Sequence, residues 1–313
     1  MKSLIPTYYK LTHYLHSLIF LVGMLALLGL IGWLVAGPSG LVWFSFAGIF
    51  LIVGTLKISP EVILHLHRAQ FLHPDDNPTL YKIIMTLAQR AGIKKVPALY
   101  YLPTRKINAF STGTKNRAYI AVSDGMLQSL TLRELTGVLA HETSHIHSND
   151  IIVMLIANVI GRLTNIMAFA GTLLIAIYVP LYLFTETQAP WLLMFILMIS
   201  PTLSALMQLA LSRSREFSAD LEAAMLCGDS LGLASALEKI DRYQGNWIAR
   251  QFSSHQYMRE PILLRTHPLV GDRVNRLKSL AYDFDPDDQI FQFSDNHVRS
   301  RPHSSRLRKP WLR

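Results

Sequence analysis

Residues 131–145 read TLRELTGVLAHETSH, and this segment ends in two histidines that are four positions apart. Its first four residues have the spacing of a capping box, and apolar residues then recur at helical intervals, which predicts a helix. On a helix, His141 and His145 project from one face a turn apart, so both imidazoles can bind the same metal ion. Glu142 lies beside the open coordination position, where it can take a proton from a metal-bound water. This pattern is typical of metal-dependent hydrolysis.

A catalytic zinc site normally needs a third protein ligand. Without one, the alternative is a buried helix whose two histidines only form hydrogen bonds. The candidate segment is SREFSAD at residues 214–220, where Glu216 and Asp220 are again four residues apart on an expected helix. One carboxylate can bind the metal while the other accepts a hydrogen bond from a ligating histidine. The apolar neighbours of this pair indicate a buried side of the helix rather than a solvated acidic face. Two imidazoles and one carboxylate favour zinc over magnesium.

Five short motifs, in this order, resemble the HtpX-type membrane metalloproteases, which are relatives of the CAAX prenyl-proteases. The motifs are NAFSTG at 108–113, VLAHETSH at 138–145, ND at 149–150, SREFSAD at 214–220 and HP at 267–268. The resemblance covers about residues 60–280. It is more specific than the HExxH motif alone, because all five motifs recur in the same order.

The resemblance implies a set of site residues. It implies that one zinc ion (Zn2+) per chain is bound by His141, His145 and Glu216. It also implies that Glu142 is the general base and that Asp220 supports a ligating histidine. The expected catalytic domain is an HExxH domain of the gluzincin type.

The region before the HExxH segment combines helices with a small sheet. Two pairs, Ser-Pro at 59–60 and Asn-Pro at 77–78, each predict a helix start, because proline is favoured at the first helical position. We expect helices at 61–72 and 79–91, and we expect the HExxH helix to continue towards the membrane. Short aromatic and β-branched runs predict the strands. These runs lie at 97–103, 107–113 and 117–122, with a hairpin turn at 113–116.

Two further predictions concern the substrate. A protease that cuts many sequences can hold its substrate as an added strand on an exposed sheet edge, because backbone hydrogen bonds do not depend on sequence. Asn108, Ala109 and Phe110 form the candidate edge, by type and by resemblance, and a plain core strand is the alternative. His267 could donate a hydrogen bond to the oxyanion of the tetrahedral intermediate, or it could connect a loop to the core.

The composition indicates several membrane spans, because half of the 313 residues are hydrophobic and only 16% are charged. Apolar runs at 17–36 and 41–56 predict a transmembrane hairpin, and the first run is too long for the core of a cleaved signal peptide. Runs at 163–184 and 191–211 predict a second hairpin, with two buried helices of a soluble domain as the alternative. The predicted fold class is therefore a mainly α-helical membrane protein, with a small β-sheet and about four transmembrane helices.

The chain divides into three predicted regions. Residues 1–56 contain the first hairpin. Residues 57–284 form the zinc metalloprotease domain, which the second hairpin interrupts at about 163–211. Residues 285–313 form a basic tail, which we expect to be flexible.

Charge predicts the orientation of the spans. His145 and Glu216 must share one metal ion, so the chain must cross the membrane an even number of times between them. The two predicted spans meet this condition. Lysine and arginine flank the other span ends, whereas the two short connections contain neither. The positive-inside rule then places both termini and the active site in the cytoplasm. The expected location is a bacterial inner (plasma) membrane. The single cysteine, Cys227, agrees with a reducing compartment.

These observations predict an integral-membrane zinc endopeptidase. We expect it to cleave membrane-associated or misfolded membrane proteins at the cytoplasmic face, and the resemblance suggests a role in quality control. The expected partners are peptide or membrane-protein substrates and the lipid bilayer. We attribute the net charge of +9 to the signal that orients the spans and to attraction to anionic lipid, rather than to binding of nucleic acid. A prenyl-protein-processing metalloprotease, expected to have more spans, and a non-catalytic membrane scaffold are the alternatives.

Overall fold

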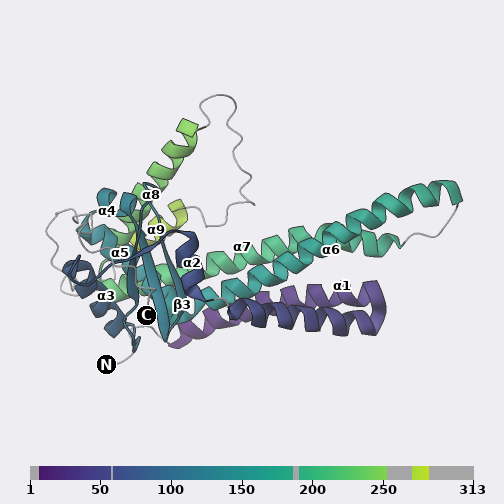
Figure 1. Ribbon diagram of the computed structural model, residues 1–313, viewed down its shortest axis with the longest axis horizontal. Helices are drawn as coiled ribbons and strands as arrows, with labels where there is room; N and C mark the ends of the chain where they lie inside the picture. Colours follow the sequence, from purple (N-terminus) through teal and green to yellow (C-terminus); the bar gives the residue numbers. More distant parts are fainter. Residues whose placement is uncertain (1–6, 58, 186–189, 252–269, 282–313) are drawn as a thin grey trace.

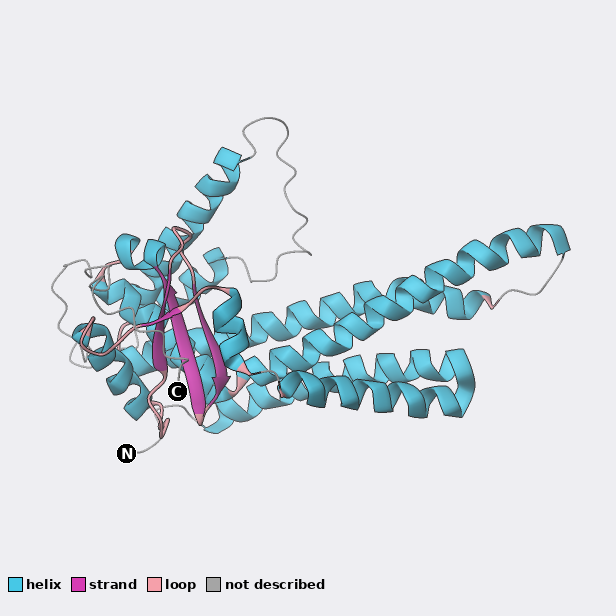
Figure 2. Ribbon diagram, in the orientation of Figure 1, coloured by secondary structure: helices cyan, strands magenta, loops and turns pink. Residues whose placement is uncertain are grey.

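The computed structural model describes residues 7–57, 59–185, 190–251 and 270–281, so the predicted tail lies outside the described residues. Long helices project from one side of a rounded region that contains the sheet (Figure 1, Figure 2). The helices are α1 (Thr7–Leu56), α2 (Pro60–Leu66), α3 (Pro78–Arg90), α4 (Asp124–Ser129), α5 (Leu132–Ser148), α6 (Asp150–Thr185), α7 (Trp191–Cys227), α8 (Ser230–Gln251) and α9 (Val270–Leu280). The strands are β1 (Gln70–Phe71), β2 (Ala98–Leu102), β3 (Ala109–Thr114) and β4 (Arg117–Ser123).

Helix α1 is a hairpin of two helices rather than one rod. Ala36 and Gly37 leave the helical conformation, and Gly37 has a φ of 60°. The two halves pack so closely that a Cβ atom on Gly40 would overlap the carbonyl oxygen of Gly32. The chain therefore reverses between the two predicted apolar runs, and its halves lie side by side (Figure 1).

The predicted fold class is confirmed. Helices α1, α6 and α7 are each long and apolar enough to cross a membrane. Because α1 is a hairpin, these helices provide the four apolar helical segments that the sequence predicts. Two glycines of α6, Gly161 and Gly171, receive side chains of α7, namely Gln208 and Leu197, where a Cβ atom would overlap them. The two hairpins share an apolar core built from Met24, Leu28, Ala157, Val159, Ile160, Leu163 and Leu211.

The expectation that the HExxH helix itself continues towards the membrane is wrong. Helix α5 ends at Ser148 because Asn149 takes a left-handed conformation with a φ of 56°. Asparagine tolerates this conformation better than other residues with side chains. Helix α6 then begins at Asp150 in a new direction. The break brings Asp150 back towards His145, which a continuous helix would not do.

The sheet has the order β1-β2-β4-β3, so β3 is an edge strand. Strands β3 and β4 form the predicted antiparallel hairpin, and β2 runs parallel to β4. The three predicted strands are thus confirmed. The predicted helix at 61–72 is wrong beyond Leu66, because Arg68 takes a left-handed conformation with a φ of 52° and the chain then enters β1.

Helix α5 lies at the centre of the region around the sheet. Its predicted capping box is present, with Thr131 and Glu134 bonding reciprocally. One face of the sheet packs in a core with α3, α5 and α8, and α2 covers the other face. Gly137 allows α8 to approach α5, because a Cβ atom at this position would lie 2.8 Å from the backbone nitrogen of Leu233. This packing holds α5 and β3 on opposite sides of one cleft.

Candidate metal centre and cleft

Three predicted ligands from two helices converge on one point. His141 and His145 belong to α5, and Glu216 belongs to the part of α7 beyond its apolar run. The Nε2 atoms of the two histidines are 3.1 Å apart. Carboxylate oxygens of Glu216 lie 3.5 Å from Nε2 of His141 and 3.9 Å from Nε2 of His145. One ligand atom from each residue therefore lies within 4.8 Å of the other two.

This donor set fits a tetrahedral zinc ion. Zinc–nitrogen and zinc–oxygen bonds of about 2.0–2.1 Å separate tetrahedral ligands by roughly 3.3 Å. The observed separations of 3.1, 3.5 and 3.9 Å, of which the last two involve different oxygens of Glu216, bracket that value. Three protein ligands also leave one coordination position open, as catalytic zinc sites require. The identity of the metal and the assignment of these ligands stay predictions.

A carboxylate orients each histidine through its other ring nitrogen. Nδ1 of His141 lies 3.0 Å from Asp220, which follows Glu216 by one turn of α7. Nδ1 of His145 lies 2.9 Å from Asp150, the first residue of α6. These contacts favour a ring that donates from Nδ1, and they direct both Nε2 atoms towards the shared point.

Two buried arginines hold these carboxylates in turn. Arg273 of α9 places two nitrogen atoms 2.7 Å from the carboxylate of Asp220 and a third 2.8 Å from Glu216. Nη1 of Arg215 lies 2.8 Å from Asp150. Charge-assisted bonds of this kind are short and roughly twice as strong as neutral ones. Each histidine is therefore the end of a His–Asp–Arg chain.

The carboxylates around His141 favour positive charge at this point. Burial lowers the pKa of the imidazole, but hydrogen bonds to Asp220 and Glu216 outweigh burial and raise the pKa to about 10. A metal cation would be stabilised by the same carboxylates, and its binding would release the proton from the ring.

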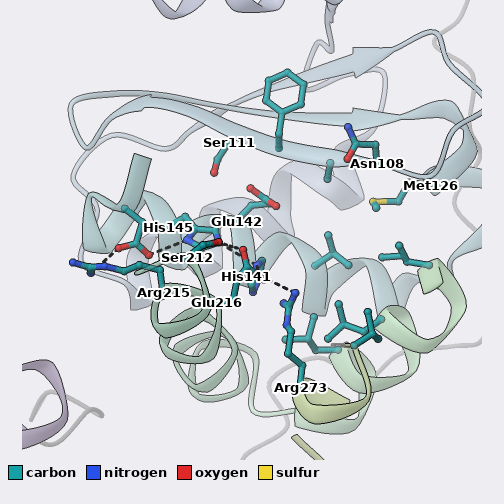
Figure 3. Close-up of a pocket in the computed structure, with 18 of the residues that line it drawn as sticks. Asn108, Ser111, Met126, His141, Glu142, His145, Ser212, Arg215, Glu216 and Arg273 are labelled. Atoms are coloured by element: carbon teal, nitrogen blue, oxygen red, sulfur yellow. Dashed lines mark hydrogen bonds and ion pairs between the residues drawn. The ribbon is translucent and has the colours of Figure 1, made fainter. Parts of the chain in front are cut away.

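Glu142 lies in a cleft between α5 and β3. The cleft has a volume of about 490 Å³ and is lined by the three candidate ligands, by Glu142 and by the edge strand. Figure 3 shows the Glu142 carboxylate directed into the space beneath β3, next to His141. A group in this position can exchange protons with a molecule that is bound at the metal centre.

The predicted substrate residues lie along the roof of the cleft. Asn108, Ala109 and Phe110 all line it. The ring of Phe110 packs against His67, on the sheet face that α2 covers, so this residue offers its backbone rather than its side chain. The role of these residues in substrate binding stays a prediction. The predicted oxyanion residue, His267, lies outside the described residues.

Three residues of the centre were not among the predicted site residues. Asp150 carries a local signal, because it follows an asparagine that can end α5 in a left-handed conformation. Arg215 lies inside the motif that supplied Glu216, but its partner is distant in sequence. Arg273 is 53 residues from Asp220, so only the docking of α9 reveals its contact.

The sequence matches a family model described as Peptidase family M48 over residues 74–281. It is 33% identical over 294 residues to a protease HtpX homolog from Sulfurihydrogenibium sp. (strain YO3AOP1), with 86% of this chain and 96% of that protein covered. It is 34% identical over 287 residues to protease HtpX of Legionella pneumophila (strain Lens), with 85% of this chain and 98% of that protein covered.

The fold is similar to that of a crystal structure of S. mikatae Ste24p, with a TM-score of 0.50 and 20% sequence identity. The likeness covers 87% of this chain and 66% of the other chain. The chain thus spans about two thirds of the length of that protein. At this identity, the likeness concerns the fold alone.

Proposed function

The chain belongs to peptidase family M48 and is an HtpX-type membrane metalloprotease, as its motifs predicted, and from this premise we propose that it is a zinc endopeptidase. In this proposal, His141, His145 and Glu216 hold one zinc ion. The observation that carries the proposal is the convergence of three ligand atoms within 4.8 Å beside an edge strand. A non-catalytic scaffold, the alternative left open by the sequence, does not agree with membership of an enzyme family.

The residues around the proposed zinc site have separate roles in peptide hydrolysis. A zinc ion held there would polarise the scissile carbonyl and acidify a bound water. Glu142 takes the proton of the attacking water and passes it to the leaving amine. Asp150 and Asp220 keep the two histidines in the orientation that they need for binding.

The proposed substrate lies as an additional strand along β3. The backbone of Asn108, Ala109 and Phe110 borders the cleft, and β3 pairs on one side only with a described strand. Backbone pairing binds many sequences, which suits an enzyme that removes damaged proteins of different kinds. This reasoning supports quality control as the physiological role.

The proposed site of action is the cytoplasmic face of a bacterial plasma membrane. The distribution of lysine and arginine supports this orientation. Helix α7 runs without interruption from its apolar segment to Glu216, so membrane proteins and segments close to the bilayer are the expected substrates. The four apolar helical segments do not favour the prenyl-processing alternative, for which more spans are expected.

The variant Glu142→Gln tests the role of the general base. An amide keeps the shape of the side chain but accepts no proton, so turnover should fall at least about a hundredfold while bound zinc stays near its normal level. Cleavage of casein or of a model membrane protein by the full chain in detergent measures turnover, and mass spectrometry measures metal content. Substantial proteolysis by Glu142→Gln would contradict the assignment.

Alanine variants test the ligands. His141→Ala, His145→Ala and Glu216→Ala should each lower the zinc content and abolish cleavage, because each removes one of three ligands. His73→Ala is a matched control, since the His73 side chain is 60% exposed in a loop. If Glu216→Ala kept full zinc content and activity, the third ligand would have to lie elsewhere.

A further inference from the structure

A short helix lies where the chain leaves the first apolar hairpin. Helix α1 ends at Leu56, and α2 begins at Pro60. An extended chain between these two residues spans at most about 14 Å. Figure 1 shows α2 between the sheet and the base of the long helices, and both α2 and α6 contact β3. Helix α2 therefore lies close to the level at which the chain enters the bilayer.

The inner face of α2 is fixed on the sheet. Leu64 is 2% exposed and belongs to an apolar cluster with Tyr100 of β2 and Ala121 of β4. The carboxylate of Glu61, one turn before Leu64, accepts a hydrogen bond from the hydroxyl group of Tyr119. These contacts define which side of the helix faces the protein.

The outer face of α2 carries two large apolar side chains. Val62 and Leu66 are four residues apart, so they project from the same face. Each is two residues from Leu64, which places it about 200° around the helix, away from the sheet. Val62 is 49% exposed and Leu66 is 77% exposed. Because contact of such side chains with water is unfavourable, this face is suited to an apolar environment.

Basic residues flank this outer face. Lys57 precedes α2 and Arg68 follows it, and both are exposed. Apolar residues on one face of a helix, with basic residues beside them, are typical of a helix that lies in the interfacial region of a membrane. Basic side chains are attracted to anionic headgroups there. The bilayer is favoured over a second copy of the chain, because α2 directly follows an apolar helical segment.

Helix α2 also contacts the edge strand of the cleft. His67, the C-cap residue of α2, packs its ring against that of Phe110 in β3, with the ring centroids 5.1 Å apart. Phe110 in turn lines the cleft. If α2 is held at the bilayer surface, it therefore holds β3 close to that surface as well.

We propose that α2 is an interfacial helix, whose Val62 and Leu66 side chains insert into the membrane leaflet on the side of the metal centre. Lys57 and Arg68 lie at the level of the lipid headgroups. Through the contact made by His67, α2 keeps the substrate strand β3 close to the bilayer. This last step rests on the proposed endopeptidase function, whereas the insertion does not.

Fluorescent labels test the insertion. Val62→Cys and Leu66→Cys each carry a nitrobenzoxadiazole label, and the full-length protein is placed in vesicles of phosphatidylethanolamine and phosphatidylglycerol. Lipids with a spin label near the headgroup should quench both labels at least about twofold, because an interfacial helix buries its apolar face at this depth. The native Cys227 should not react, since it is 2% exposed.

Met85→Cys is the matched control. Met85 is 54% exposed on α3, on the other side of the rounded region from the long helices (Figure 1). Its label should not be quenched. Equally weak quenching at all three positions would overturn the proposal. Blue-shifted emission from the labels on α2 without quenching would also overturn it, because a protein partner, such as a second copy, would then cover this face.

Serine substitutions test the consequence for cleavage. The double variant Val62→Ser, Leu66→Ser should cleave a membrane protein in vesicles at least about fivefold more slowly, because its outer face loses the apolar groups that favour insertion. Cleavage of casein in detergent should not change. Met85→Ser should affect neither assay. Unchanged cleavage in vesicles, or an equal loss in both assays, would overturn the link between α2 and the substrate strand.

The two kinds of measurement separate this inference from the proposed function. Quenching of the labels does not require catalysis, so it can be measured in Glu142→Gln as well. If Glu142→Gln still cleaved casein, the proposed mechanism would fail while the quenching result stood. If the labels were not quenched, the insertion would fail while the loss of activity in Glu142→Gln stood.

Discussion

At the scale of single residues, the candidate metal centre is a network of alternating charges. His141 and His145 each contact an aspartate, and each aspartate contacts an arginine. Arg273 is the most connected member, since it contacts both Asp220 and Glu216. The centre is thus complete only when α9, which carries Arg273, is docked on α7.

Removal of one orienting carboxylate should weaken metal binding without removing a ligand. We expect Asp220→Asn to lower zinc affinity about 10–100-fold, because the amide supports the His141 ring less well than a carboxylate does. Competition with a fluorescent zinc chelator measures the affinity.

Asp272→Asn is the control for this prediction, since Asp272 is an exposed residue of the same helix as Arg273. It should leave zinc affinity unchanged. An unchanged affinity for Asp220→Asn as well would show that Asp220 does not support the ligand.

The sequence predicted the residues of the centre whose spacing is local. His141 with His145, and Glu216 with Asp220, are four residues apart, so helical geometry alone places each pair on one face. Arg273 was not predicted because its contacts depend on how distant helices pack.

At the scale of elements, Gly137 shows how packing overrides helix propensity. Glycine costs a helix interior about 1 kcal/mol relative to alanine. At this position, however, a Cβ atom would lie 2.8 Å from the backbone nitrogen and 2.9 Å from the Cα of Leu233. Backbone atoms cannot move aside as a flexible side chain can, so α8 would have to shift.

We therefore expect Gly137→Ala to destabilise the protein by about 1–3 kcal/mol, as overpacked core positions do. Gly271→Ala in α9 is the control, because a Cβ atom there meets nothing within 4 Å. The control should leave stability unchanged or raise it. Thermal unfolding in detergent measures both variants, and a more stable Gly137→Ala would show that α8 adapts to the larger side chain.

Elements were predicted well where hydrophobic pattern and turn residues agreed. The three main strands and both apolar hairpins fall in this group. The errors lie at Arg68 and Asn149, where one residue in a left-handed conformation ends a helix. Asparagine is a local signal for this conformation at position 149, whereas arginine is not one at position 68.

At the scale of the whole molecule, the proposed orientation puts the far ends of the two apolar hairpins on the outer side of the membrane. Ser39, in the turn of α1, and Asn116, in the turn between β3 and β4, are both exposed. Charge asymmetry predicts that the first lies outside the cytoplasm and the second inside it.

Cysteine labelling checks this orientation. Ser39→Cys should react with a membrane-impermeant maleimide in intact cells, whereas Asn116→Cys should react only after lysis. The parent protein is the control, because its own Cys227 is 2% exposed. Reaction of Asn116→Cys in intact cells would contradict a cytoplasmic active site.

The second hairpin connects the apolar helical segments directly to the candidate metal centre. Helix α6 starts with Asp150, which contacts His145, and α7 carries Glu216 beyond its apolar run. With 36 residues, α6 is about 54 Å long, and its first residue, Asp150, contacts His145 of the candidate metal centre. A helix pair responds to a thicker or thinner bilayer by changing its tilt. Because α6 contacts His145 and α7 carries Glu216, we expect a change in tilt to alter the spacing between these two residues, so that membrane thickness affects the geometry of the candidate metal centre.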